Sequence, residues 1–493
     1  MTTAALAAVV LTAPVVMAGE VAGASAVPGD RPQRVLAWRD CGDGLRCAKL
    51  SVPVDWARPR AGRTEIDLAL MPAQNPGQNL GPLVVNTGHG PTIQAVRARP
   101  DTVSELTRWF DVVLIEQRGL GDRGSEAAVR CSVPPPDALR LQLTPGRNAW
   151  RAYARDNAAY ARSCRIAAGP RHAGLTSWQV AHDLDALRIA LGAKRLRYFG
   201  NAYGAVYGQA YLELFPRRVE RMYLEGVPDH TQTSLGRRMI AQARALERQL
   251  YAFRDWCRGL MGCALDGGDA VSVLDDLLER APLPAGPGRT VDARQVVAAV
   301  IAGLAQQRWP ELVRAMSAAW EGDASALVPL AAAAEPLAPA TVSRSMLCHD
   351  FMPELPGYRR FLAMEAKLRA LAPRVGWLTG RYEIARCLGV VRGQGGPSWP
   401  PGPLRTSVRR PVLIGIGRLD TQSPASGAAK VAARIPKAAV LRHGDGHGAY
   451  LLQGAKRLRA TCLRTRVHGY LVNGALPEKG TSCPSELTTD IVP

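Results

Sequence analysis

The chain is poor in several features that mark particular classes of protein. Lysine supplies only seven of the 62 basic residues, and aromatic residues make up 6% of the 493 positions. The arginines are scattered singly or in pairs, without a longer basic run or a basic patch interleaved with aromatics, so we expect no nucleic-acid partner despite a formal charge of +20. Beyond the N-terminal stretch no 18-residue apolar run lacks both charge and proline, so we expect no membrane span in the mature protein.

The remaining composition is that of an ordinary globular protein, with 47% hydrophobic and 21% charged residues. The length allows two or three domains, or one large α/β domain with an insertion. The sequence contains no internal repeat.

Residues 1–26 have the pattern of a signal peptide. Residues 3–16 are apolar and rich in alanine, and Ala24, Ser25 and Ala26 fit a small-residue cleavage site. The usual basic start is missing, so a buried N-terminal helix is the alternative. We expect a secreted or cell-surface, extracytoplasmic protein.

Ten cysteines fit an oxidising compartment, where disulfides form and persist. Counting alone leaves the connectivity open, but local spacing suggests neighbours. The candidate pairs are Cys41 with Cys47, Cys131 with Cys164, Cys257 with Cys263, Cys348 with Cys387, and Cys462 with Cys483. Two pairs have Cys-x5-Cys spacing, but no histidine stands near either at ligand spacing, so disulfides are favoured over a metal site. We expect neither a metal nor another cofactor.

The distribution of strand and helix patterns predicts an α/β fold. Short buried-strand runs at 83–85, 112–115 and 196–199 alternate with helical patterns in the first part of the chain, which indicates a mostly parallel sheet with crossover helices. From 231 to 400 the pattern changes to helices and Pro/Gly linkers, without a convincing strand. Strands return at 412–416 and near Val440.

The predicted architecture is therefore one α/β core in two parts, with helices on both faces of the sheet. Residues 32–230 form the first part of the core, and residues 401–493 complete it. Residues 231–400 form an inserted helical cap.

Residues 197–204 join a predicted strand to a predicted helix, which is the setting of the G-x-S-x-G nucleophile elbow. Gly200 and Gly204 supply the small residues that such a sharp turn requires. The central position, however, is Ala202, whose methyl group cannot attack a carbonyl. No serine, threonine or cysteine within the elbow can replace the missing nucleophile.

An acid and a base follow in the order typical of α/β-hydrolases. Asp420 stands just after the strand at 412–416, and His447 lies in the glycine-rich loop at 444–448. Asp420 would orient the imidazole, and His447 would act as general base toward the group at position 202. His443 competes for this role, but it lies at the end of the preceding strand.

With these elements the sequence resembles the secreted tripeptidyl-aminopeptidase family of α/β-hydrolases, which also has esterase-like members. The resemblance covers nearly all of the mature chain. The matching motifs lie at 41–47, 52–55, 117–121, 183–188, 197–204, 214–216, 221–227, 348–350, Cys387, 399–400, Asp420, 446–447 and 462–483. As a set they imply the α/β-hydrolase fold.

The resemblance implies removal of short peptides from free N-termini, or hydrolysis of related amides and esters. The backbone N–H of Tyr203 would be one oxyanion donor, and the loop after the strand at 83–85, with Gly88 and His89, would supply the other. Glu225 and Asp350 are candidates for binding a substrate ammonium, although each could equally be a structural ion-pair partner.

The sequence departs from the family at two catalytic places. Ala202 replaces the serine, and residues 86–92 replace a Pro-Gly-Gly-Pro-Gly type of oxyanion loop. Loss of the nucleophile costs on the order of a millionfold in rate, or roughly 8 kcal/mol. An engineered knockout would change residue 202 alone, so the unusual loop favours a natural sequence.

Three functions fit these observations. The first is an exported hydrolase-family protein for peptide-like or ester substrates, inactive or strongly weakened by Ala202. The second is a non-catalytic protein that binds such ligands in the inherited pocket. The third is a non-covalent lyase, cyclase or transferase in which His447 is the base.

Overall fold

The structure is a computed structural model of the chain. It describes residues 36–88, 90–122, 124–232, 234–260, 263, 265, 269–305, 308–332, 343–351, 355–390 and 402–488. The predicted signal peptide at 1–26 and the oxyanion candidate His89 lie outside the described residues. The described residues, from Leu36 to Thr488, form one compact unit.

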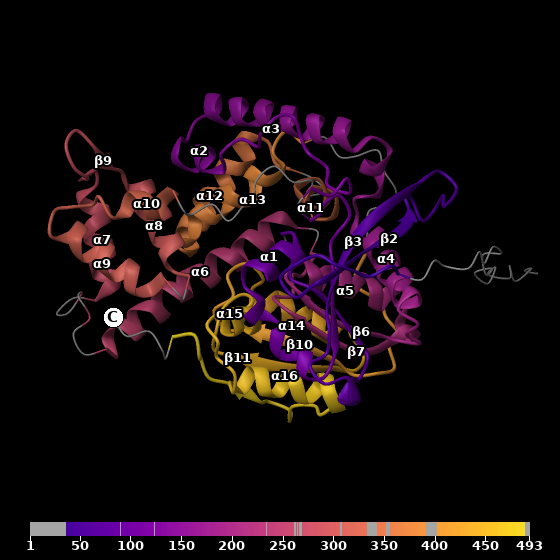
Figure 1. Cartoon of the computed structure of the whole chain (residues 1–493). Coiled ribbons are helices and arrows are strands. Elements are labelled where there is room, and N and C mark those ends of the chain that lie inside the picture. Colours follow the sequence, from indigo (N-terminus) through magenta and orange to yellow (C-terminus); the bar gives the residue numbers. More distant parts are fainter. Residues whose placement is uncertain are drawn as a thin grey trace, which may run out of the picture. The chain divides into compact units, whose positions relative to one another are not determined.

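A ten-stranded sheet runs through the described residues in the order β1-β2-β3-β5-β4-β6-β7-β10-β11-β12 (Figure 1). Its strands are β1 (Arg39–Asp40), β2 (Arg46–Pro53), β3 (Arg63–Met71), β4 (Pro82–Asn86), β5 (Asp111–Ile115), β6 (Leu196–Asn201), β7 (Val219–Glu225), β10 (Val412–Gly417), β11 (Ala438–His443) and β12 (Ser482–Cys483). Strands β1, β2 and β3 pair antiparallel at one edge, β3 pairs antiparallel with β5, and the remaining neighbours are parallel. The prediction of a mostly parallel sheet in an α/β fold is confirmed.

The strand runs predicted from the sequence correspond to β4, β5, β6, β10 and β11. The predicted runs leave out β2, β3 and β7. The burial of β2 alternates along much of its length, because one of its faces packs on the core while the other meets solvent. Such a strand has no continuous apolar run.

Successive residues of the central strands point to opposite faces of the sheet. Leu83 and Val85 of β4 pack in a cluster with α1 (Thr92–Ala98), α15 (Ala449–Ala455) and α16 (Cys462–Asn473). Val84, between them, packs on the other face with α4 (Ser177–Ala190), α5 (Tyr203–Leu214) and α14 (Ala425–Ala433). Helices therefore cover both faces, as predicted.

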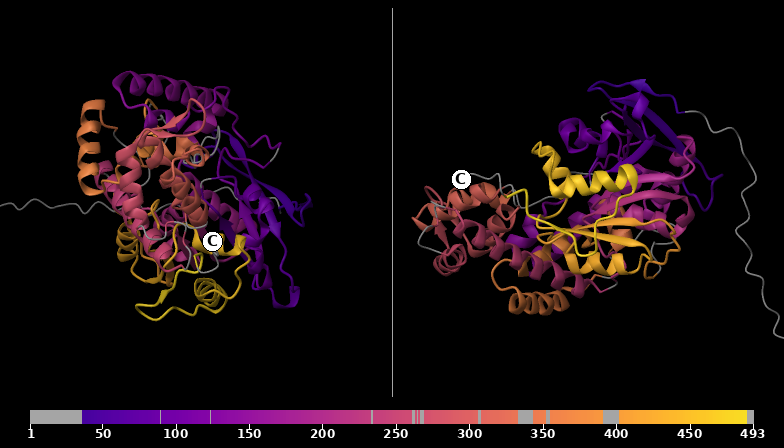
Figure 2. Two further views of the ribbon diagram at one scale, coloured as in Figure 1. Left: turned by 90° about the vertical axis from the view of Figure 1, so that its left-hand side faces the viewer. Right: turned by 90° about the horizontal axis from the view of Figure 1, so that it is seen from below.

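A group of helices is inserted between β7 and β10 (Figures 1 and 2). They are α6 (Leu235–Arg258), α7 (Ala270–Arg280), α8 (Ala293–Gly303), α9 (Trp309–Trp320), α10 (Leu327–Ala332), α11 (Ser343–Phe351), α12 (Tyr358–Leu371) and α13 (Thr379–Cys387). Most of them share a hydrophobic core of their own. The expectation of no strand in this segment is wrong, because β8 (Leu283–Pro284) and β9 (Thr290–Val291) form a short hairpin.

Two helices that precede β6 join this inserted layer, α2 (Ala138–Leu143) and α3 (Arg147–Ala168). The Tyr153 hydroxyl of α3 donates to the carbonyl of Ala385 at 3.1 Å, and the Asn157 amide donates to the carbonyl of Leu388 at 2.9 Å. In Figure 1, α2 and α3 lie beside α12 and α13. The helical layer thus includes residues that the sequence pattern assigned to the core.

All five predicted disulfides are present: Cys41–Cys47, Cys131–Cys164, Cys257–Cys263, Cys348–Cys387 and Cys462–Cys483. The Cys348–Cys387 bond ties α11 to α13, next to the candidate site described below. Among the described residues, no helix combines the length and the apolar character that crossing a bilayer requires.

A buried ion pair joins α4 to the sheet. The Arg118 guanidinium binds the Asp183 carboxylate through two nitrogens, at 2.6 and 2.7 Å, and also donates to the carbonyls of Pro53 and Val54 at the end of β2. The side chains of Arg118 and Asp183 are only 2% and 1% exposed. Removing one charge would leave the other buried without a counter-ion.

We expect Asp183→Asn to destabilise the protein by about 3–5 kcal/mol, because the amide cannot neutralise Arg118. The matched control is Glu65→Gln, which breaks a pair with Lys49 at a similar distance, 2.8 Å, but with both side chains about half exposed. That change should cost less than about 1 kcal/mol. Chemical denaturation measures both, and equal losses would contradict a structural role for the buried pair.

Candidate active site

The turn between β6 and α5 has the geometry of a nucleophile elbow. Ala202 adopts φ 50° and ψ −113°, a conformation that alanine rarely takes. Its N–H donates to the carbonyl of Glu225 at 3.0 Å, and its carbonyl accepts from the N–H of Ala205 at 3.0 Å. The turn is thereby held between the end of β7 and the first turn of α5, so position 202 is presented at the carboxyl end of the sheet.

The two glycines of the motif are required by close backbone contacts. A Cβ at Gly200 would lie 2.5 Å from the carbonyl oxygen of Gly204, and a Cβ at Gly204 would lie 2.6 Å from the carbonyl oxygen of Asn86. Neither distance is compatible with a side chain. The small residues noted in the sequence therefore permit the turn to form against β4.

His447 and Asp420 form the expected pair. Nδ1 of His447 lies 3.0 Å from Oδ2 of Asp420, and Oδ1 of Asp420 accepts from the N–H groups of Gln422 and Ser423. Asp420 is buried, whereas the His447 side chain is 18% exposed. Because Nδ1 is engaged, Nε2 is the nitrogen left for proton transfer.

The imidazole of His447 rests on Gly226, just after β7. A Cβ at Gly226 would lie 2.7 Å from Cε1 of His447, so only glycine leaves room for the ring. Burial favours the neutral imidazole, but the carboxylates of Asp420 and Glu225 outweigh burial and raise the pKa of His447 above its usual 6.5.

The competing histidine, His443, is unsuited to a catalytic role. It is 2% exposed, its Nε2 lies 3.5 Å from the Glu225 carboxylate, and it does not line the cavity described next. Burial lowers the pKa of His443 to about 4. The structure places it behind the elbow, inside the sheet.

A cavity of about 750 Å³ lies between the elbow and the inserted helices. Asn201, Ala202, Tyr203, His447 and Gly448 line it from the core, and residues of α6, α8 and α13 line it from the inserted layer. The nucleophile position and the histidine thus border one cavity. Among the described residues, no group of three metal-ligating side chains is brought together here or elsewhere.

One oxyanion candidate is placed differently from the prediction. The backbone at Gly88 packs against the elbow, where a Cβ would lie 2.9 Å from Cβ of Ala202. Its N–H, however, donates to the side chain of Asn86 at 3.1 Å, so it is not available to an oxyanion. Asn86 competes for this donor because it stands at the end of β4, directly before the loop. The N–H of Tyr203 opens α5 beside the cavity, as the prediction requires.

Neither carboxylate suggested for a substrate ammonium lines the cavity. Glu225 is buried, accepts from the N–H of Tyr450 at 3.2 Å, and has a pKa raised to about 7 by burial. Asp350 accepts hydrogen bonds from the hydroxyls of Tyr203 and Ser177 at 2.8 and 2.5 Å. Both act within the protein, which favours the structural alternative over ligand binding for these two candidates.

The cavity residues that sequence reasoning missed lie on the inserted helices. Arg238 of α6, together with Glu383 and Arg386 of α13, borders the cavity opposite the elbow. No motif marks them, because charged residues are common on helices and their facing direction depends on how the helices pack. Their spacing alone could not have identified them.

Comparisons with known proteins agree with this geometry. Residues 382–483, which include Asp420 and His447, match a family model described as TAP-like protein. The chain is 25% identical over 508 residues to the tripeptidyl aminopeptidase of Streptomyces coelicolor, covering 95% of this chain and 90% of that one.

Two mycobacterial relatives match more locally. The chain is 30% identical over 316 residues to serine protease Hip1 of Mycobacterium tuberculosis, and the match spans 58% of each protein. It is 27% identical to carboxylesterase B of the same species, over 64% of this chain and 65% of the relative. The solved esterase of Exiguobacterium antarcticum shares 13% identity over 83% of this chain and 96% of its own, with a TM-score of 0.35. At such a low score the fold assignment rests on the sheet and elbow themselves.

We expect Asp420→Asn to lower the pKa of His447, because the substitution removes the nearest negative charge from the imidazolium. Titration of the ring by NMR measures the shift. Asp229→Asn is the control, since Asp229 also lines the cavity but has no contact with His447. Equal shifts in the two variants would contradict the specific Asp420–His447 interaction.

Proposed function

Because this chain belongs to the tripeptidyl-aminopeptidase-like family of α/β-hydrolases, we propose that its cavity binds peptide-like amides or esters and that serine catalysis is lost or strongly weakened. The observation that carries the proposal is that the elbow and His447, which is paired with Asp420, border the same cavity, with a methyl group where the nucleophile would be. We place this activity outside the cytoplasm, because the five disulfides and the N-terminal pattern are typical of export.

Ligand binding and covalent chemistry depend on different atoms of this site. The missing hydroxyl oxygen removes the acyl-enzyme route, which costs on the order of a millionfold in rate. The cavity walls, by contrast, do not depend on that atom. The names of the relatives, a tripeptidyl aminopeptidase, a serine protease and a carboxylesterase, support amides and esters as the ligand class.

The retained pair supports a second candidate. His447 has its Nδ1 fixed by Asp420, so Nε2 is positioned to take a proton from a water or a ligand hydroxyl held above Ala202. Such a reaction would be non-covalent. It requires turnover by the wild-type protein that is lost in His447→Ala, without any trapped acyl-enzyme.

We expect Ala202→Ser to create a functional nucleophile, because the turn already has the required conformation. Hydrolysis of p-nitrophenyl esters and tripeptide anilides should rise by at least about a thousandfold over wild type. A fluorophosphonate should label the variant and leave the wild type unlabelled. His447→Ala in the same background should abolish both signals.

The matched control is Ala241→Ser, which adds a hydroxyl to the cavity wall on α6, away from the elbow. This variant should gain neither labelling nor turnover. If folded Ala202→Ser protein remains inert toward esters, anilides and the fluorophosphonate, the inherited hydrolase site is refuted.

The activity of Ala202→Ser should rise with pH. His447 acts as base only when neutral, and its pKa is raised, so the midpoint of log kcat/KM should lie above pH 6.5. Adding Asp420→Asn lowers that pKa and should move the midpoint down while reducing the plateau. A midpoint below 6.5 in the single variant would contradict the role assigned to Asp420.

A further inference from the structure

The cavity wall carries an excess of positive charge. Its cationic residues are Arg99, Arg237, Arg238, Arg308, Arg386 and Lys430, whereas its carboxylates are Asp229 and Glu383. Six positive and two negative groups leave a net charge of +4 in the lining. A cleft with charge of one sign and low-dielectric walls concentrates ligands of the opposite sign.

Arg238 and Arg386 carry part of this charge on the inserted helices α6 and α13, opposite the elbow. Burial lowers the pKa of Arg238; the carboxylate of Glu383 opposes this shift, and the guanidinium of Arg386 adds to it. The two arginines come from different helices, and both border the cavity that Ala202 and His447 also line.

The nearby carboxylates are already engaged by protein groups. Glu383 lies 3.4 Å from Arg386 and accepts from the amide of Gln242 at 3.1 Å. Asp229 lies 3.6 Å from Arg434 and accepts from the hydroxyl of Thr231. These contacts engage both carboxylates. They do not neutralise the positive charges of Arg237 and Lys430, for which the described residues show no carboxylate partner.

The acids behind the cavity wall are likewise engaged. Asp420 interacts with His447 and two backbone N–H groups, and Asp350 accepts from Tyr203 and Ser177. Neither lines the cavity. No described carboxylate therefore faces the cavity in a position to bind a free ammonium without competition from an arginine.

From this arrangement we infer that the cavity selects ligands that carry a carboxylate, with Arg238 and Arg386 as specificity residues, and disfavours peptides with a free ammonium. The inference rests on the proposed binding of peptide-like ligands and adds the charge of the ligand. It differs from what an aminopeptidase site would require, because a free N-terminus needs a cavity carboxylate, and both Asp229 and Glu383 are already engaged by arginines.

The test uses wild-type protein, in which Ala202 prevents serine-dependent turnover, and one tripeptide amide, Ala-Ala-Phe-NH2, with three N-termini. The succinyl form is anionic, the acetyl form is neutral, and the free amine is mostly protonated at about pH 7. Calorimetry should give a succinyl affinity about tenfold above that of the acetyl form, with the free amine weakest.

Arg238→Gln and Arg386→Gln should each reduce the ratio of succinyl to acetyl affinity severalfold, because each substitution removes a positive charge from the cavity wall. The control is Arg410→Gln. Arg410 is an exposed arginine just before β10, near the amino ends of the parallel strands and away from the carboxyl ends that border the cavity, and it pairs with Glu220 at 3.0 Å. It should not change the preference. In wild type, raising salt from about 0.05 to about 0.5 M should also reduce the preference, which supplies a readout that needs no variant.

The outcomes separate the two proposals. Equal affinity for all three peptides, or tightest binding of the free amine, overturns the inference and leaves the proposed function standing. A succinyl preference that survives both arginine substitutions overturns the assignment of Arg238 and Arg386. Failure of all three peptides to bind overturns the proposed function itself.

Discussion

The strained turn at Ala202 is the constraint on which the rest of the site depends. A non-glycine residue at φ 50° costs on the order of 1–3 kcal/mol and persists only where its surroundings hold it. Gly200 and Gly204 allow the backbone of β6 and α5 to meet β4, and the carbonyl of Glu225 fixes the Ala202 N–H. Because the turn is fixed, the side chain of residue 202 and the first N–H of α5 have fixed positions at the floor of the cavity.

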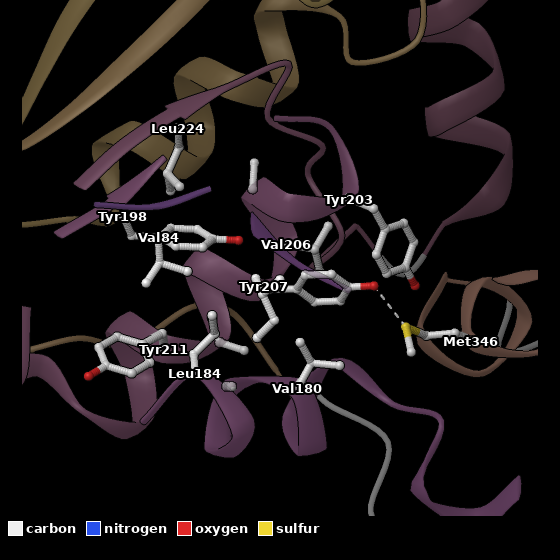
Figure 3. Packing of buried hydrophobic residues seen from close by; sticks show 14 of the residues in the cluster. Val84, Val180, Leu184, Tyr198, Tyr203, Val206, Tyr207, Tyr211, Leu224 and Met346 are labelled. Atoms are coloured by element: carbon white, nitrogen blue, oxygen red, sulfur yellow. Dashed lines mark hydrogen bonds between the residues drawn. The ribbon is translucent and has the colours of Figure 1, made fainter. Parts of the chain in front are cut away.

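The inserted helices are tied to this turn through the side chain that follows it. Tyr203 donates from its hydroxyl to Asp350 of α11, and Tyr207, one turn further along α5, contacts Met346 of the same helix at 3.0 Å. Figure 3 shows Tyr203 and Tyr207 reaching toward Met346 from α5. The position of α11 is therefore coupled to the elbow by buried polar contacts as well as by apolar packing, so cavity shape and elbow geometry are not independent.

The sequence predicted those parts of the molecule that local chemistry determines. Two glycines around position 202, an acid after one strand and a histidine in a glycine-rich loop are readable because strand ends in a parallel sheet meet at one edge. Gly88 could not be judged in this way, since its N–H is taken by Asn86 only once the loop has folded. Arg238 and Arg386 could not be identified from the sequence for a related reason. Which faces of α6 and α13 meet the cavity depends on how the helices pack, including the packing of α2 and α3.

The charged groups around the cavity come from two parts of the molecule: the core, which forms the floor of the cavity, and the inserted helices, which form its roof. Behind the elbow, burial raises the pKa of Glu225 to about 7 and lowers that of His443 to about 4, so burial disfavours the charged form of both members of this adjacent pair. The floor contributes the Asp420–His447 pair, which is close to neutral overall when the imidazole is protonated, together with Arg99, Asp229 and Lys430. The inserted helices contribute more positive charge, with Arg237, Arg238, Arg308 and Arg386 against Glu383, while the core supplies the proton-transfer geometry. Because the two properties reside on separate elements, the proposed loss of serine chemistry at position 202 does not alter the charge selection that we infer for the cavity.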